Sequence, residues 1–400
     1  MSKFIDPSEV TTSRRYVHFP TEILIQIAEF ISNIPRSQAT LQRFCSVSRQ
    51  WYSAGIEFLY CRPQLQQGNS FLLFTNTVCP SIRSRERKVD LGSFVQELNL
   101  GSLVHQSSNS LTARLLGRVK KNLRTFIAPR VSFSPKPTSF SRINSLAPLA
   151  KCKELSYLGL DIVAEPIPLS ALKKAISGLG KLETLTLPSS MFITDDGSTE
   201  DWPSNLECLQ VGGRFDVGKM SSFRWPPNLH SLTLCGCENL DTPVLEKILF
   251  NEQIRTTLTR LVIHSSNREM FEAGPSEVLP TLIALNSLRI PIDLLHHFLI
   301  IPGLDPMSVA TSIRELELTA PYDDDFSDLI APDDLCVALK TTLSEVCYLG
   351  ISPGCLKRLP EASHARLDEW VWENIDKCSE EELDCLSDMG LVIMDSEPIC

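Results

Sequence analysis

The sequence predicts an α/β solenoid, a curved parallel sheet with a helical or extended convex side, preceded by a small all-α domain. Three observations in its 400 residues predict this fold. An apolar pattern recurs along most of the chain, several segments between its copies have helical periodicity, and a short segment near the start has helical periodicity alone. The chain is therefore organised as one repeat array with a separate helical segment in front of it.

The recurring pattern is an apolar residue, two variable residues, an apolar residue, one variable residue and an apolar residue. Its first members are 23 to 33 residues apart, close to the period of leucine-rich repeats. The pattern occurs at Val95, Leu98 and Leu100; Leu123, Phe126 and Ala128; Leu155, Leu158 and Leu160; Leu182, Leu185 and Leu187; Leu206, Leu209 and Val211; Leu229, Leu232 and Leu234; Leu258, Leu261 and Ile263; Leu285, Leu288 and Ile290; Ile313, Leu316 and Leu318; and Val346, Leu349 and Ile351. It predicts a leucine-rich-repeat solenoid of about ten repeats.

Each copy predicts a short strand, because its last two apolar residues are separated by one residue and so share a face. The residue between them then points to the concave side. Four connections have apolar residues at helical spacing, which predicts return helices at 111–119, 172–179, 245–249 and 335–343. Two shorter units begin with Trp-Pro, at Trp202 and Trp225. Because proline interrupts a helix, we expect extended chain there, with each tryptophan covering the gap.

The segment Phe19 to Leu65 shows three helical patterns. The first begins after Pro20 and ends before Pro35, the second begins near Leu41, and the third contains Trp51 and ends at Arg62 and Pro63. So short a unit cannot bury all its Ile, Phe and Trp side chains in a core of its own. We therefore expect a partner to cover one of its faces.

The order and spacing of residues in this segment resemble the F-box motif, which reads roughly Leu-Pro-x-Glu, two apolar residues and a spaced Ile and Leu, then Val-Ser-basic-x-Trp. The matching residues are Phe19, Pro20, Glu22, Ile23, Leu24, Ile27 and Ile31, then Val47, Ser48, Arg49 and Trp51. Phe19 stands where the family usually has Leu, and the resemblance covers about a tenth of the chain. The alternative is that the segment is an ordinary helical cap of the solenoid.

The resemblance implies a substrate-recognition adaptor of an SCF-type cullin-RING ubiquitin ligase, in which the F-box binds a Skp-type linker protein and the repeats bind a target protein. The residues expected on the linker are Phe19, Pro20, Ile23, Leu24, Ile27, Ile31, Leu41, Val47 and Trp51. A second resemblance supports the first. Leu229 to Leu249 is similar to the cysteine-containing class of leucine-rich repeats that commonly accompanies F-boxes, with Cys237 at the turn position. The remaining alternative is a leucine-rich-repeat scaffold that regulates a GTPase or inhibits an enzyme.

The expected domains are an F-box helical domain at 18–65, a linker and N-terminal cap at 66–92, the repeats at 93–352 and a C-terminal cap at 353–400. The outward strand positions would form a continuous concave face, large enough for a protein partner. Arg and Tyr are favoured anchors in interfaces, so we expect the substrate-binding residues among the polar side chains of this face. They are Tyr157, Asp161, Arg260, His264, Arg289, Glu315, Glu317 and Tyr348.

Charge is distributed unevenly along the chain, whose net charge is -10. Residues 62–153 carry 15 Lys or Arg and three acids, whereas residues 300–400 carry 22 acids and six bases. An extended solenoid keeps these regions apart. The densest basic run, Arg83 to Lys88, has no interleaved aromatic residue and is interpreted as a solvated loop, not a nucleic-acid site.

The chain shows no long apolar run and no basic-then-apolar start, so we expect a cytoplasmic or nuclear protein without a membrane partner. Its 13 cysteines are scattered and are interpreted as reduced thiols.

Motifs for catalysis or cofactor binding are incomplete. Gly213 to Lys219 matches a glycine-rich phosphate loop up to its lysine, but Met220 replaces the magnesium-binding Ser or Thr, so an ordinary repeat turn is predicted. Cys235 and Cys237 lack a second ligand pair, and His296-His297 lacks a third ligand. We therefore expect no cofactor, no metal site and no catalytic residues, and interpret the chain as a non-enzyme.

Overall fold

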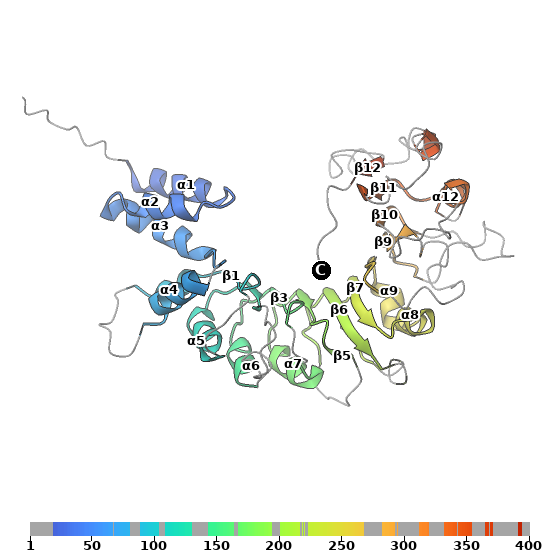
Figure 1. The fold of residues 1–400 in the computed structure, drawn as a ribbon, viewed down its shortest axis with the longest axis horizontal. Coiled ribbons are helices and arrows are strands. Elements are labelled where there is room, and N and C mark those ends of the chain that lie inside the picture. Colours follow the sequence, from blue (N-terminus) through green and yellow to red (C-terminus); the bar gives the residue numbers. More distant parts are fainter. Residues whose placement is uncertain are drawn as a thin grey trace, which may run out of the picture. The chain divides into compact units, whose positions relative to one another are not determined.

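The computed structural model describes residues 19–66, 68–80, 89–103, 109–129, 143–163, 167–193, 201–216, 218, 220, 223–267, 282–292, 294, 312–319, 332–341, 343–353, 365–367, 369–370 and 391–393. The chain divides into two compact units, Met1–Gln64 and Leu65–Cys400. The described part of the first unit is helical, and the second unit contains a parallel sheet (Figure 1). No helix in the described ranges is both long and apolar enough to cross a membrane.

The described part of the first unit contains three helices, α1 (Thr21–Ser32), α2 (Gln38–Cys45) and α3 (Arg49–Cys61). The side chain of Ser48 accepts a hydrogen bond from the Trp51 backbone N–H, which caps the start of α3. Helices α2 and α3 approach closely at Gly55, where a Cβ atom would lie 2.7 Å from the Phe44 ring and 2.9 Å from the Cys45 sulfur. A side chain at this position would therefore force the two helices apart.

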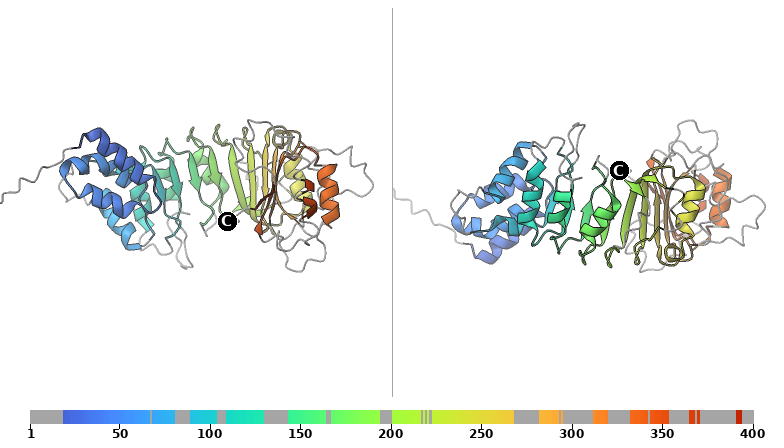
Figure 2. Two further views of the ribbon diagram at one scale, coloured as in Figure 1. Left: turned by 90° about the horizontal axis from the view of Figure 1, so that it is seen from above. Right: turned by 90° about the horizontal axis from the view of Figure 1, so that it is seen from below.

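The second unit is a leucine-rich-repeat solenoid, and its described residues form a 12-stranded sheet in which all strand pairs are parallel (Figures 1 and 2). Its continuous path follows chain order except that β5 pairs only with β6. The strands are β1 (Glu97–Asn99), β2 (Thr125–Ile127), β3 (Tyr157–Gly159), β4 (Thr184–Thr186), β5 (Phe192–Ile193), β6 (Cys208–Phe215), β7 (Ser231–Glu238), β8 (Arg260–Ile263), β9 (Ser287–Pro291), β10 (Glu315–Thr319), β11 (Tyr348–Ile351) and β12 (Leu391–Ile393).

The strand register follows the apolar pattern. Its middle residue occupies equivalent positions on neighbouring strands, as in Leu98 opposite Phe126 and Leu316 opposite Leu349. These side chains are buried from β1 to β11, so the pattern forms a continuous apolar core beneath the sheet. The ten predicted strands are all present, which confirms the prediction of the solenoid.

Helices lie on the outer side of the strands in this unit (Figure 1). The four predicted return helices correspond to α5 (Asn109–Val119), α7 (Leu169–Ile176), α8 (Thr242–Leu249) and α12 (Pro332–Lys340). The additional described helices are α4 (Gly68–Val78), the 3-10 turn η1 (Leu91–Phe94), α6 (Ile143–Leu149) and α9 (Glu252–Thr257). Asp241 caps α8 by accepting a hydrogen bond from the Val244 N–H.

The Trp-Pro units are non-helical at 201–207 and 223–230, and both tryptophans are buried, as predicted. The Trp202 Nε1–H donates to the Arg224 carbonyl at 2.7 Å, and the Phe223 ring packs between Trp202 and Trp225. The buried Lys173 of α7 places its Nζ 4.6 Å from the centroid of the Trp202 ring. A cation–π contact therefore joins a helical repeat to an extended one.

One prediction about the strands was wrong. Gly213 lies inside β6 and not in a turn, because β6 and β7 continue beyond the repeat pattern and β5 pairs with the extension. The Gly213 φ angle is +93°, and a Cβ atom there would lie 2.2 Å from the Met191 carbonyl oxygen. Glycine thus permits the register shift and the close approach of the chain leading to β5.

Near the end of the chain, the apolar run at Leu391–Ile393 forms β12, which continues the sheet by pairing with β11. Part of the predicted C-terminal cap therefore extends the repeat sheet. Most of that cap lies outside the described residues, as do the basic run Arg83 to Lys88 and the pair His296-His297.

Candidate functional site

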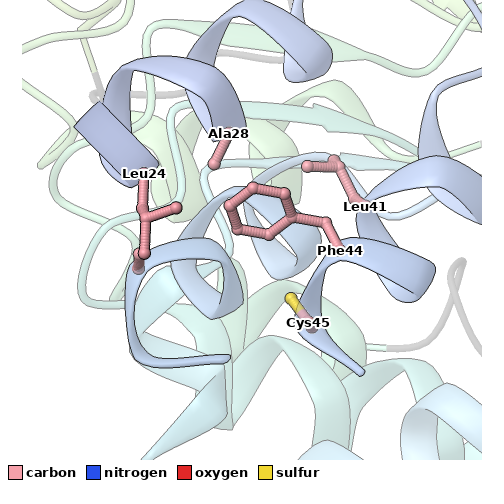
Figure 3. Packing of buried hydrophobic residues seen from close by; sticks show 6 residues of the cluster. Leu24, Ala28, Leu41, Phe44 and Cys45 are labelled. Carbon is pink, nitrogen blue, oxygen red and sulfur yellow. The ribbon is translucent and has the colours of Figure 1, made fainter. Parts of the chain in front are cut away.

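The helical unit has a filled apolar core of its own (Figure 3). Leu24 and Ala28 of α1 pack with Leu41, Phe44 and Cys45 of α2, and all five side chains are buried. The expectation that Leu24 and Leu41 contact a linker protein therefore needs correction, because their side chains are enclosed within the unit. They support its surface from beneath.

Apolar side chains also remain on the outside of this unit. On α1, Ile23 and Phe30 are exposed, and their spacing of seven residues places them on one stripe beside the core-facing stripe. Ile27 lies on the same flank and is partly buried, and Val47 is exposed after α2. Helical periodicity indicated an apolar face on α1 but did not separate these two stripes.

Sequence reasoning missed Phe30 and three other exposed apolar residues of this unit, Ile25, Ile34 and Tyr52. Ile25 lies on the other flank of α1, since it is two positions, about 200° of helical turn, from Ile23. Consecutive apolar residues along α1 could have indicated these exposed positions, because only one side of a helix in a three-helix unit can face the core. The unit thus presents apolar surface that its own core does not use.

The start of this unit is fixed to α3. The Phe19 ring meets the Trp51 indole edge to face at 6.2 Å between centroids, and the indole packs on the Phe44 ring at 4.6 Å. The Gln50 side-chain amide donates to the Phe19 carbonyl oxygen at 2.9 Å. The exposed Pro20 follows directly. Partly buried Trp51 therefore connects the core to the exposed Phe19, and Ile31 packs against the same core.

The second candidate site is the concave face of the repeats, where two rows of side chains run across the strands in register. The first row is Glu97, Thr125, Tyr157, Thr184, Cys208, Ser231, Arg260, Ser287, Glu315 and Tyr348. The second row is Asn99, Ile127, Gly159, Thr186, Gln210, Thr233, Val262, Arg289, Glu317 and Gly350. Charged residues in these rows concentrate on β8, β9 and β10.

Three of the predicted substrate-binding residues form a connected ion-pair cluster. Arg289 Nη1 lies 3.2 Å from Glu317 Oε2, and these side chains are only 13% and 14% exposed. Arg260 Nη2 reaches the other carboxylate oxygen, Oε1, at 3.4 Å and is 42% exposed. Glu317 is thus shared by the mostly buried Arg289 and the more exposed Arg260.

Tyr348 and Glu315 lie beside this cluster. They are opposite one another in the register of β10 and β11, and Gly350 leaves room for the Tyr348 ring next to Glu317. Burial raises the pKa of the Tyr348 phenol, and the carboxylates of Glu317 and Glu315 raise it further, against the lowering effect of the two arginines. The phenol therefore stays protonated and neutral at physiological pH.

His264 is held by hydrogen bonds at the end of β8. Its Nδ1 accepts from the Ser266 backbone N–H at 3.1 Å, which places the ring proton of the neutral imidazole on Nε2. The Ser266 hydroxyl also accepts from the Gly236 N–H at 2.8 Å. Next in the chain, the buried Asn267 side chain accepts from the Cys237 N–H and donates to the Leu234 carbonyl, both at 2.8 Å. This structural role of Asn267 was not predicted.

Tyr157 and Asp161 lie apart from the cluster, because β4, β6 and β7 separate β3 from β8 in the sheet. Asp161 Oδ1 accepts a hydrogen bond from the Thr186 hydroxyl at 3.0 Å, and that hydroxyl accepts from the Leu160 N–H. The eight predicted residues therefore divide into the ion-pair cluster of three, the adjacent Glu315 and Tyr348, a hydrogen-bonded His264 and a separate Tyr157–Asp161 pair.

Among the residues with described positions, no group of three or more His, Cys, Asp or Glu side chains is placed to hold a metal ion. Cys235 and Cys237 are buried, and the Cys237 sulfur lies 3.4 Å from the Val211 carbonyl oxygen. Burial raises the pKa of the Cys237 thiol. Both cysteines thus belong to the packing of β7.

No family model matches the sequence. The chain is 30% identical over 247 residues to "F-box protein YDR306C" of Saccharomyces cerevisiae, across 62% of this chain and 48% of that protein. It thus spans about half the length of that relative. It is 26% identical over 279 residues to "Protein pof5" of Schizosaccharomyces pombe, across 69% of this chain and 74% of that protein. Together with the repeats, these similarities support an F-box-like, leucine-rich-repeat protein.

Two solved structures show weaker likeness. The Rad7 and Elc1 complex from yeast aligns over 86% of both chains with a TM-score of 0.39 and 14% identity. An internalin of Listeria monocytogenes aligns over 76% of this chain and 88% of its own with a TM-score of 0.31 and 13% identity. At these TM-scores the likeness supports no inference about function.

Proposed function

We propose that this chain is the substrate-recognition adaptor of an SCF-type E3 ubiquitin ligase. Its helical unit binds a Skp-type linker protein, the repeats bind a target protein, and the chain itself catalyses nothing. Ubiquitin transfer is promoted by holding the target near the ligase. This role places the protein in the cytoplasm or nucleus.

One observation carries the proposal. The helical unit keeps an apolar stripe, Ile23 and Phe30, on the outside although its core is already filled by Leu24, Ala28 and Phe44. A helix that serves only as a cap needs one apolar face, whereas α1 has a second that its own unit does not cover. The order of Pro20, Ser48 and Trp51 and the F-box relative agree with this interpretation.

The test uses the full-length chain and a purified Skp-type linker protein. Ile23→Glu should abolish binding, because it places a charge on the stripe without entering the core. Ile25→Glu is the matched control, since Ile23 and Ile25 are both 41% exposed but lie on opposite flanks of α1. Circular dichroism of each variant confirms folding.

Equal linker binding by wild type and Ile23→Glu would refute the proposed role of the stripe. A linker that binds neither variant nor wild type would refute the adaptor function itself and favour the leucine-rich-repeat scaffold.

A further inference from the structure

The charge pattern of the concave face indicates what the repeats recognise. From β2 to β7 both rows consist of uncharged residues, whereas β8, β9 and β10 carry Arg260, Arg289, Glu315 and Glu317. Charges at an interface select the partner and fix its register more than they add raw affinity. The charged strands are therefore where a target would be distinguished from other proteins.

The positive side of this region lies over β8 and β9. Arg289 and Glu317 form a mostly buried pair at 3.2 Å, so their charges largely cancel. Arg260 shares the same carboxylate but remains 42% exposed, and one carboxylate cannot neutralise two guanidinium groups. Arg260 thus presents the unmatched positive charge to a partner.

The negative side lies over β10 and β11. In the described part of the chain the Glu315 side chain makes no hydrogen bond or ion pair, and its register neighbours are Ser287 and the neutral phenol of Tyr348. Ser287 is small and buried, so no long side chain of the first row stands between Arg260 and Glu315. The two residues therefore start two strands apart and face the same side, and the Arg260 guanidinium reaches across to Glu317 of β10.

We propose that this patch binds an unphosphorylated peptide segment that presents an acidic side chain to Arg260 and a basic side chain to Glu315. The inference rests on the proposed function, in which the repeats hold a target protein. Two strand spacings are about 10 Å, and an extended peptide advances about 3.3 Å per residue. Because the Arg260 guanidinium reaches toward β10, this backbone separation is an upper limit, and a peptide crossing the strands would carry its acid and its base at most about three residues apart.

Phosphorylation is not the feature recognised. Sites for phosphoserine or phosphothreonine collect arginines without competing carboxylates. Here two carboxylates accompany two arginines, so the four ionised groups sum to zero and a phosphate dianion would gain little net attraction. A segment with one charge of each sign matches the patch at both ends.

The test measures binding of defined peptides to the full-length chain by fluorescence anisotropy. The peptides are ten residues long, contain one Glu and one Lys at spacings of one to six residues in either order, and have a matched series with phosphoserine replacing Glu. We expect the tightest binding at spacings of three or fewer and weaker binding at spacings of four to six. Replacing either peptide charge by alanine should weaken binding about fivefold.

Variants of the chain test which of its residues contacts each charged side chain of the peptide. Arg260→Gln should become indifferent to the peptide acid but keep its dependence on the lysine, and Glu315→Gln should show the reverse. Arg255→Gln on α9 and Glu345→Gln before β11 are matched controls, since both residues are exposed and lie outside the two rows. They should behave as wild type.

Selective binding of phosphopeptides, equal binding at every spacing, or equal losses in the control variants would overturn the proposal. Linker binding, measured on the same preparations, tests the adaptor function separately. Selective peptide binding without linker binding would support the proposed peptide site and refute the proposed role in a ubiquitin ligase.

Discussion

Replacing Glu317 with methionine should destabilise the repeat unit, because it leaves Arg289 mostly buried without a counter-ion. Breaking a fully buried ion pair by removing one partner costs about 3–5 kcal/mol. Arg289 and Glu317 are 13% and 14% exposed, so some water reaches them and we expect about 2–3 kcal/mol. The pair with Arg260 adds little, because Arg260 is 42% exposed and can be solvated instead.

Replacing both partners should cost much less. Arg289→Met together with Glu317→Met substitutes apolar side chains for a pair whose Arg289 Nη2 already has no hydrogen-bond partner in the described structure. Such replacements are often close to neutral, so the double variant should lie within about 1 kcal/mol of wild type. The two single effects should therefore be strongly non-additive.

Urea unfolding followed by far-UV circular dichroism and by tryptophan fluorescence measures these differences. The two transitions must coincide for a single free energy to apply, because repeat arrays can unfold in parts. Glu345→Met is the control, since the residue is exposed and should shift stability by less than about 0.5 kcal/mol. A Glu317→Met variant as stable as wild type, or single effects that simply add, would refute the reasoning.

Three further predictions concern other parts of the second unit. Gly213→Ala should cost about 2 kcal/mol or more by thermal or urea unfolding, because its φ of +93° and the Met191 carbonyl oxygen leave no room for a side chain; unchanged stability would contradict the bulge. Asn267→Ala should cost about 1–3 kcal/mol, since it leaves the Cys237 N–H buried without a partner, whereas the Leu234 carbonyl oxygen keeps its hydrogen bond from the His264 N–H; unchanged stability together with unchanged amide exchange at Cys237 would contradict this. In the native protein iodoacetamide should label Cys208 long before Cys152, because burial raises the pKa of the Cys152 thiol to about 12 and only the thiolate reacts; mass spectrometry of digested samples measures the order.

The repeat fold could be predicted because its signal is periodic. The middle apolar residue of each repeat, such as Leu316, recurs at a spacing typical of stacked strands. The strand register and the core side chains could therefore be predicted from the sequence. The extension at β5, β6 and β7 could not be predicted in this way. Gly213 matches both a phosphate-binding loop and a bulged strand, and the choice between them depends on the contact with Met191, which is distant in sequence.

In the helical unit the helices could be predicted from the sequence, but the side chains that face its core could not. Spacing showed that Ile23, Leu24 and Ile27 lie on α1 near one another, yet it did not show which of them faces α2 and α3. That choice depends on how three helices pack, and here Phe44 and Gly55 bring α2 and α3 into the contact that encloses Leu24. Tertiary packing therefore separates the supporting residues from the exposed ones.

The same distinction applies on the concave face, where two strands share the sequence Tyr-Leu-Gly but differ in the hydrogen bonding of the neighbouring carboxylate. Tyr157-Leu158-Gly159 and Tyr348-Leu349-Gly350 each place a tyrosine ring against a glycine and near a carboxylate. Beside Tyr157, Asp161 is already hydrogen-bonded to Thr186 of the next strand, so this group stabilises the sheet. Beside Tyr348, Glu315 has no such partner in the described chain. A polar group that its neighbouring strand leaves unsatisfied is available to a target, and on this criterion we place the proposed recognition surface at β8 to β11 and not at β3.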